Sequence, residues 1–271
     1  MRMFKSLTVA VAVAVAVAGV LLAAGCSSGD DSGSKKGGGG TTTKSSAPTA
    51  AESAAAAAAT TDLNAAVQEL TKTSYKYSMK AGDASGTGTV DPTLKQSSMV
   101  ISVAEFKTEL LVIDPELYAR ITGLPMAGVD AKKWLKIDRS KIKSFTALGI
   151  RDVNDPTGVN TLAKTIATIQ KTGDKSYKGT LDLSKGSDAF GLDEAAVRQL
   201  AEKAKAIPFE ATVNDAGKLA TWKMTIPAYG AEKQTSFELA YSEHGGKFPV
   251  TKPAAGETAN PPQVVYDMLQ V

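Results

Sequence analysis

The sequence contains few of the residues from which catalytic and metal sites are most often built. One cysteine and one histidine occur among its 271 residues. Zinc sites take many of their ligands from cysteine and histidine, and a serine nucleophile usually needs a neighbouring histidine as its base. We expect the one histidine, His244, to lie in a surface turn at residues 243–246. The composition therefore predicts a protein that is not an enzyme and that uses neither a metal nor another cofactor.

An excess of charge of either sign is also lacking. The chain carries 31 lysine and arginine residues against 28 aspartate and glutamate residues, a formal net charge of +3. Two of the positive charges, Arg2 and Lys5, lie at the very N-terminus, and the remaining lysines are interspersed with acidic residues. A nucleic-acid-binding surface needs a concentrated basic patch, often with aromatic side chains between the basic ones. We therefore expect no nucleic acid among the partners.

A long uncharged segment is present at the N-terminus. Residues 7–24 are mostly apolar, follow Arg2 and Lys5, and end in small residues before Cys26. A basic start, an apolar run and a small-residue stop are typical of an export signal. Residues 23–26, Ala-Ala-Gly-Cys, resemble the lipobox of bacterial lipoproteins, although that family prefers leucine at the first of these positions. Because the run is almost long enough to cross a membrane, an uncleaved transmembrane anchor is the alternative.

The lipobox resemblance implies that Cys26 receives diacylglycerol and becomes the new N-terminus. A lone cysteine cannot form an internal disulfide, and a free thiol is a liability outside the cell, so acylation accounts for its presence. Two or three acyl chains, such as palmitate, anchor a protein durably where one chain does not. We predict that the protein is attached through Cys26 to the outer, extracytoplasmic face of the cell membrane.

Composition then divides the chain into three parts. We assign residues 1–25 to a lipoprotein signal peptide, residues 26–61 to the acylated cysteine and a flexible tether, and residues 62–271 to a single globular domain. The tether is rich in Gly, Ser, Thr, Ala and Lys and has no large apolar residue, so it cannot bury enough surface to fold. The alanines at 54–59 favour a partial helix there. The third part is long enough to form a sizeable core.

Periodicity in the first half of the domain predicts a short helix followed by a meander of strands. Leu63, Val67 and Leu70 recur at helical spacing, which indicates a helix over residues 62–71. Residues 86–88, Gly-Thr-Gly, indicate a turn or a weak strand. Short connections between the strands favour antiparallel pairing. The strands that alternation predicts are residues 75–79, 96–103, 106–113, 116–121 and 132–138.

The second half of the domain predicts two helices and four strands. Asp155 followed by proline is a helix start signal, and the apolar face that follows runs to a stop at Gly173. A strand over residues 177–183 separates this helix from a second helix, which begins near Asp193 and stops at Pro208. The last three strands alternate around Phe209, Trp222 and Phe237.

The alternation in these strands leaves one face of the sheet polar and the other apolar. An antiparallel sheet of this kind has one solvated face and one face that must be covered. The two amphipathic helices are the natural cover. We therefore predict an α+β fold: a large curved antiparallel sheet, or half-barrel, with helices packed on its apolar concave face.

Several segments resemble the actinobacterial LppX/LprG type of lipoprotein. They are residues 117–120 (Leu-Tyr-Ala-Arg), 133–138 (Lys-Trp-Leu-Lys-Ile-Asp) and 214–219 (Asn-Asp-Ala-Gly-Lys-Leu). The order of elements is similar over most of residues 62–271. The resemblance implies a LolA-like half-barrel whose helices enclose an apolar cavity for acyl chains, and a role in carrying or presenting lipids or glycolipids at the cell envelope. It transfers no individual ligand residue, because such cavities depend on shape and apolarity.

Seven apolar residues are candidates for lining such a cavity. Flexible Met and Ile side chains suit adaptable apolar pockets, but they suit an ordinary core equally well, and the core is the alternative for each residue. The alternative for the whole protein is a non-catalytic tethered sensor or interaction module, as in RseB-type regulators, which contacts a protein partner through the exposed side of residues 132–138. The candidates are Met99, Ile101, Leu162, Ile166, Ile169, Met224 and Phe237.

Two short motifs match penicillin-recognising enzymes. Residues 140–143 fit the S-x-x-K pattern of the nucleophile, and residues 171–173 read K-T-G. The S-D-N element does not occur between them, and the segment between them is too short for the helical domain that those enzymes need. Residues 171–173 also suit a helix end with a glycine stop. We interpret both matches as coincidental.

Overall fold

The computed structural model describes residues 49–123, 125–142, 155–185, 192 and 194–269. The predicted signal peptide, Cys26 and most of the predicted tether lie outside the described residues. Lys143 of the S-x-x-K match and Asp193 at the predicted helix start lie outside them as well.

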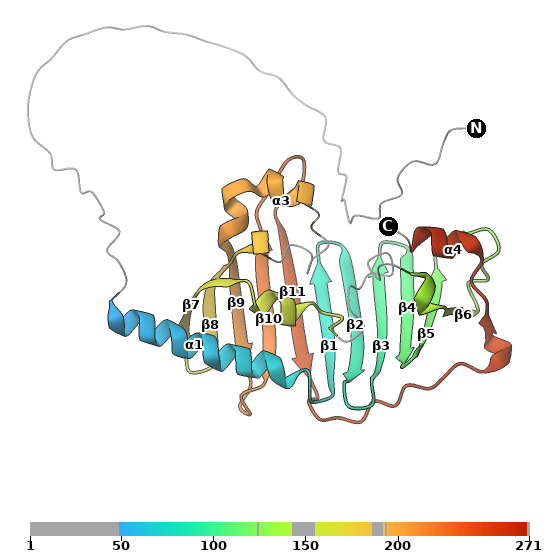
Figure 1. Cartoon of the computed structure of the whole chain (residues 1–271), viewed down its shortest axis with the longest axis horizontal. Helices are drawn as coiled ribbons and strands as arrows, with labels where there is room; N and C mark the ends of the chain where they lie inside the picture. The colour runs from blue at the N-terminus through green and yellow to red at the C-terminus, as the bar shows by residue number, and fades with distance from the viewer. Residues whose placement is uncertain (1–48, 124, 143–154, 186–191, 193, 270–271) are drawn as a thin grey trace, which may run out of the picture.

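The described chain forms one twelve-stranded sheet with a few short helices and one long helix (Figure 1). The strand order is β12-β6-β5-β4-β3-β2-β1-β11-β10-β9-β8-β7, and every neighbouring pair is antiparallel except β12 and β6. This confirms an α+β fold built on a large, mainly antiparallel sheet. The strands are β1 (Tyr75–Ala81), β2 (Ala84–Asp91), β3 (Gln96–Val103), β4 (Phe106–Ile113), β5 (Glu116–Thr122), β6 (Trp134–Ile137), β7 (Ile166–Gly173), β8 (Ser176–Leu181), β9 (Ile207–Val213), β10 (Leu219–Ile226), β11 (Thr235–Ser242) and β12 (Thr258–Ala259).

Helices connect and flank this sheet. The α-helices are α1 (Ala50–Glu69), α2 (Val159–Ala163), α3 (Glu194–Leu200) and α4 (Gln263–Met268), and the 3-10 helices are η1 (Arg139–Lys141), η3 (Leu183–Lys185), η5 (Ala201–Ala206) and η6 (Ala255–Glu257). Among the described residues, no helix is both long and apolar enough to cross a membrane.

Most of the strands lie where their alternation predicts them. The predicted strands of the first half correspond to β1, β3, β4, β5 and β6, and those of the second half to β8, β9, β10 and β11. The weakly indicated segment with Gly86 and Gly88 is a full strand, β2, which pairs with β1 and β3 along its whole length. Cross-strand pairing on both sides therefore overrides the low strand propensity of glycine.

The predicted helix from Asp155 to Gly173 is wrong over most of its length. Only Val159–Ala163 is helical, and the chain then forms edge strand β7 from Ile166 to Gly173. Ile166 and Ile169 fit helical spacing, but this stretch is rich in β-branched Thr and Ile, which favour a strand. Pairing with β8 decides the outcome: Ile169 is 7% exposed, whereas its neighbours in the strand face solvent.

Helix α1 begins at Ala50 rather than at residue 62, so the last part of the predicted tether is helical. A capping box starts it: the Glu52 N–H donates to Thr49 Oγ1 over 3.2 Å, and the Thr49 N–H donates to Glu52 Oε2 over 2.7 Å. The capping box satisfies two backbone donors at the helix start, and the alanine run that follows has the highest helix propensity of any residue type.

Helix α1 contacts β7, β10 and α2 and crosses the sheet over β7–β11 (Figure 1). Its buried residues Ala59, Leu63, Ala66 and Val67 belong to the same hydrophobic core as the sheet. Since α1 has an almost uniform alanine surface over its first half, Leu63 and Val67 supply most of the apolar area that docks it.

The two faces of the sheet differ in chemistry. The apolar face carries Tyr77, Met99, Leu110, Trp222 and Leu239, all of them buried. The solvated face carries alternating polar residues along the same strands. A row of them crosses five strands through adjacent pairs, namely Lys178, Glu210, Lys223, Glu238 and Lys80.

The segment after β11 returns to the far edge of the sheet and is fixed there by charge. Glu116 on β5 accepts hydrogen bonds of 2.8 Å from both Lys136 and Lys252. These two ammonium groups lower the pKa of Glu116 to about 2. Beyond them, the Tyr266 hydroxyl accepts a hydrogen bond from the Asp138 N–H at 3.1 Å, which joins α4 to the end of β6.

Replacing Leu63 with alanine tests the docking of α1. Leu63 is fully buried between α1 and the rest of the core, so we expect Leu63→Ala to lower the free energy of unfolding by about 2–5 kcal/mol. Gln68, which is exposed on the same helix, is the control. Gln68→Ala should change the free energy of unfolding by less than about 0.5 kcal/mol. Urea unfolding followed by circular dichroism measures both. Equal effects would contradict the docking of α1 through this face.

Candidate functional site

The apolar face is built from cross-strand rows of side chains. One row runs through directly paired residues from Tyr241 on β11 to Tyr77, Gly88, Met99 and Leu110 on β1–β4. The next row runs from Leu239 on β11 through Met79, Gly86 and Ile101 to Thr108. Because side chains alternate between faces, all of these positions lie on the apolar side.

Two glycines on β2 leave room for large side chains from β1. A Cβ atom at Gly88 would lie 2.6 Å from both Cε1 and Cζ of Tyr77, and one at Gly86 would lie 2.7 Å from Cγ of Met79. The Tyr77 ring and the Met79 side chain therefore lie flat over β2 instead of standing upright on β1. Glycine is required at both positions because any side chain would occupy the same space.

The side chains on this face become more exposed from one cross-strand row to the next. The row through Tyr77 and Met99 is buried, with exposed fractions of 3% and 4%. In the next row Met79 and Ile101 are half-buried, and Phe106 at the start of β4 is 37% exposed. The apolar face of β1, β3 and β4 is thus buried along the row through Tyr77 and Met99 and partly open from the next row onward.

Three tyrosines form a cluster on the covered part of this face. The Tyr75 ring centroid lies 6.3 Å from that of Tyr77 and 5.7 Å from that of Tyr241 in an edge-on arrangement. The Tyr241 hydroxyl and Thr157 Oγ1 form a buried hydrogen bond of 3.0 Å, which ties the segment before α2 to the sheet. Burial raises the pKa of all three tyrosines above their usual range, so they are neutral at physiological pH.

Three buried polar atoms have no hydrogen-bond partner in the described part of the chain: Tyr77 Oη, Asn160 Oδ1 and Trp222 Nε1. Trp222 is stacked on Phe209 at a centroid distance of 4.9 Å and lies under α1 on β10. Tyr77 lies over β2, beside the more open part of the face. Buried polar groups without a partner are uncommon in proteins and call for an explanation.

The seven predicted cavity residues all belong to one apolar core or pack against it. Ile169, Met224 and Phe237 fall on one cross-strand row at β7, β10 and β11, whereas Met99 and Ile101 lie across the sheet on β3. Leu162 on α2 is fully buried, and Ile166 begins β7 half-buried. The structure therefore separates Met99 and Ile101 on β3 from the other five residues, which lie on α2, β7, β10 and β11.

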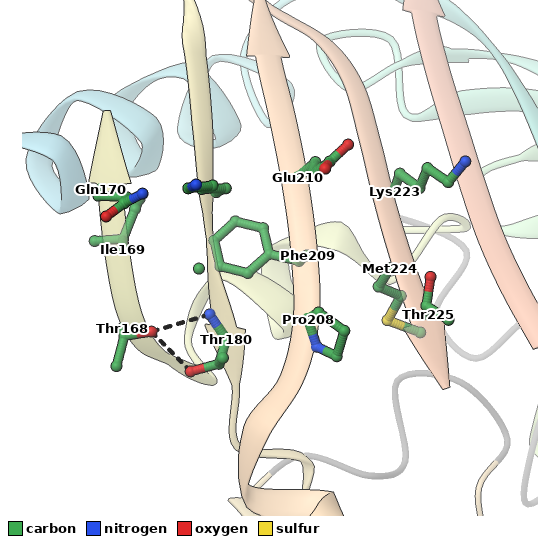
Figure 2. Close-up of a pocket in the computed structure, with 12 residues that line it drawn as sticks. Thr168, Ile169, Gln170, Thr180, Pro208, Phe209, Glu210, Lys223, Met224 and Thr225 are labelled. Carbon is green, nitrogen blue, oxygen red and sulfur yellow. Dashed lines mark hydrogen bonds between the residues drawn. The ribbon is translucent and has the colours of Figure 1, made fainter. Parts of the chain in front are cut away.

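A hollow of about 500 Å³ lies on β7–β10 (Figure 2). It is lined by three consecutive residues from each strand: 168–170, 178–180, 208–210 and 223–225. Most of the side chains that point to solvent there are polar, and the Thr168 and Thr180 hydroxyls are hydrogen-bonded at 2.8 Å. The hollow is therefore a shallow polar depression of the solvated face and differs from the apolar cavity that the sequence predicts.

The charges in and beside this hollow neutralise one another. Lys223 Nζ lies 2.9 Å from Glu238 Oε1, and this contact lowers the pKa of Glu238 and raises that of Lys223. Glu210 is paired in register with both Lys178 and Lys223. The arrangement stabilises the sheet surface by cross-strand pairing of opposite charges.

Other residues considered from the sequence are occupied by local contacts. His244 is half-buried, with Nε2 3.0 Å from the Leu219 carbonyl oxygen, and burial lowers its pKa. The Ser140 hydroxyl donates to Asp138 over 2.7 Å. The K-T-G at 171–173 lies in strand β7, so its interpretation as a helix end is wrong. In the described ranges, no group of three His, Cys, Asp or Glu residues is placed to hold a metal.

The surface suggested for a protein partner, residues 132–138, is largely engaged within the chain. Lys133 donates to the Gly256 carbonyl over 2.6 Å, and Lys136 is paired with Glu116. Trp134 and Leu135 pair with β12, and Arg120 lies over the Trp134 ring at 4.4 Å. This surface joins the C-terminal segment to the sheet.

Comparison of the sequence with protein-family models and with curated proteins finds no match.

Sequence reasoning missed the most distinctive part of the site, the Tyr77 and Gly88 pair. Alternation predicts a strand over residues 75–79, but the position of the Tyr77 ring depends on the glycine opposite it in β2. The available signal was the pair of glycines spaced two apart, at 86 and 88, next to a strand with large residues two apart, at 77 and 79. Such spacing places each glycine across from one large side chain when the two strands form a tight hairpin.

Substituting Gly88 tests this packing. The added methyl of Gly88→Ala would overlap the Tyr77 ring and the Ser98 carbonyl oxygen, so we expect a loss of about 1–3 kcal/mol in the free energy of unfolding. Gly173→Ala in β7 is the control, since its Cβ would lie 3.9 Å from the nearest atom, and it should change stability by less than about 1 kcal/mol. Urea unfolding of both variants measures the difference. A tolerated Gly88→Ala would show that the Tyr77 ring does not lie over β2.

Proposed function

We propose that this protein is a membrane-anchored extracytoplasmic lipoprotein that binds an acyl lipid or glycolipid on the apolar face of its sheet. In this proposal the acylated Cys26 holds the chain at the outer face of the membrane, and the residues before α1 act as a tether. The sheet curves as a half-barrel of the LolA-like type, with its helices on the concave apolar side. The domain carries or presents its ligand and performs no catalysis.

The observation that carries the proposal is the incomplete cover of the apolar face. Met79 and Ile101 are half-buried and Phe106 is 37% exposed, although they lie on the same face of β1, β3 and β4 as the buried residues Tyr77, Met99 and Leu110. A soluble domain rarely leaves a contiguous apolar surface open unless something binds to it. Acyl chains match such a surface because they need burial and no specific polar contact.

The anchor is tested by replacing its cysteine. We expect Cys26→Ser to move the protein from the membrane fraction to the soluble extracytoplasmic fraction, because the acyl chains supply its membrane affinity. Metabolic labelling with an alkyne palmitate analogue should label the wild type and leave the variant unlabelled. Ser27→Ala, which alters the neighbouring position, is the control and should stay in the membrane. A Cys26→Ser chain that stays membrane-bound would indicate an uncleaved apolar anchor instead.

Lipid binding is tested in the Cys26→Ser chain, which carries no covalent acyl group. Purified gently from its own cell type, this chain should release a stoichiometric lipid that mass spectrometry of an organic extract identifies. Ile101→Asn should lower the bound lipid at least fivefold, since it places an amide on the apolar face.

Val100→Asn is the matched control for that experiment. Val100 is also half-buried, but it is the next residue along β3 and lies on the opposite face of the sheet. We expect the Val100→Asn variant to bind as much lipid as the parent chain. Empty wild-type protein, or equal loss in both variants, would overturn binding on this face.

A further inference from the structure

Among the three buried polar atoms without a partner in the described residues, the Tyr77 hydroxyl lies beside the open part of the apolar face. Its side chain is 3% exposed, and the hydroxyl has no hydrogen-bond partner within the described residues. Burial raises the pKa of Tyr77, so the group is a neutral O–H donor at physiological pH. A buried donor without an acceptor destabilises the folded state, and it is tolerated where a ligand supplies the acceptor.

The position of the ring determines where this hydroxyl points. Cζ, which bears the hydroxyl, lies over Gly88 of β2, so the oxygen is displaced from β1 toward β3. Across Gly88 the paired residue is Met99, and the adjacent row holds Met79 and Ile101. The donor is therefore surrounded by flexible apolar side chains that can move to admit a chain-like ligand.

The surroundings also restrict the charge of the acceptor. Tyr75, whose ring lies next to Tyr77, has its pKa raised by the Asp155 carboxylate as well as by burial. A second anion, such as a free carboxylate or phosphate, would meet this negative charge with one neutral donor to stabilise it, which is unfavourable in an apolar site. A neutral acceptor avoids this cost.

We propose that the Tyr77 hydroxyl donates a hydrogen bond to the ester carbonyl oxygen of an acyl lipid held on the apolar face. This rests on the proposed function and adds to it a residue that selects the class of ligand. The acyl chain lies along Met79, Met99 and Ile101, and the ester group is buried at Tyr77. Fatty ethers and hydrocarbons of the same length lack the carbonyl and bind more weakly.

A pair of lipids that differ only in the carbonyl tests the proposal. In the Cys26→Ser chain, 1-palmitoylglycerol and its ether analogue 1-hexadecylglycerol compete with a fluorescent acylglycerol probe, which is neutral, and the displacement curves give both affinities. We expect the ester to bind roughly tenfold more tightly than the ether, as for one buried hydrogen bond. Tyr77→Phe should abolish this preference, leave the affinity for the ether unchanged, and leave the urea midpoint no lower than that of the parent chain.

Tyr241→Phe is the matched control, because the Tyr241 hydroxyl already has Thr157 as its partner. It should lower the urea midpoint and keep the preference for the ester. Together the two variants distinguish a hydroxyl that stabilises the folded state, as at Tyr241, from one that binds the ligand, as proposed for Tyr77.

Each remaining outcome has a distinct meaning. If the parent chain binds neither lipid, the proposed function itself fails. If it binds both lipids equally, or if Tyr77→Phe weakens both by the same factor, lipid binding stands and the role of Tyr77 is overturned. In that case an ordered water satisfies the hydroxyl, or the ring acts through packing alone.

Discussion

The structure depends on covering one face of a very wide sheet. Twelve strands in a single sheet present an apolar face that reaches from edge strand β7 to β6. Hydrophobic burial is the main favourable term in folding, so every other element is arranged to remove part of this face from water. Helix α1 contacts β7 and β10, and Val265 and Tyr266 of α4 are buried in the same hydrophobic core as the sheet. Between them lies the half-buried part with Met79 and Ile101, and the proposed function follows from that incomplete cover.

The two ends of the sheet, at β7 and at β6, are also in contact with other parts of the chain. The exposed edge of a sheet can pair with other chains, and proteins usually protect it. Edge strand β7 has two register irregularities, and Lys171 on it lies near Asp62 of α1. At the other edge, the C-terminal segment adds the two-residue strand β12 to β6 and is held there by Glu116. The β7 edge is thus irregular and contacts α1, whereas β6 is paired with a strand from the C-terminal part of the domain.

The Tyr77 site illustrates how packing and polarity interact within one row. Glycine at position 88 lets the Tyr77 ring lie flat, and this lowers the height of the surface over β2. The same geometry carries the hydroxyl away from Tyr241, whose own hydroxyl is satisfied by Thr157. Two tyrosines at directly paired positions therefore differ: the Tyr241 hydroxyl is bonded to Thr157, whereas the Tyr77 hydroxyl has no partner among the described residues, and we propose that it donates to the ligand.

The sequence by itself determined the features that depend on short-range pattern. Alternation in segments such as residues 96–103 and 106–113 predicts strands with the observed bounds, because a period of two is enforced by backbone geometry alone. The export signal and the lipobox at Cys26 are also read from local order, and they stay predictions. The apolar composition of the seven candidate residues correctly placed them in or against the core.

Tertiary structure decided what short-range pattern leaves open. Ile166 and Ile169 have helical spacing, and pairing with β8, which lies later in the chain, made the segment a strand. Glycines 86 and 88 indicated a turn or a weak strand in isolation, and pairing with β1 and β3 made them part of the sheet. The position of the Tyr77 ring over Gly88 follows from that pairing. These outcomes depend on pairing with the next strand across a short turn, whose free energy exceeds the small differences in local propensity.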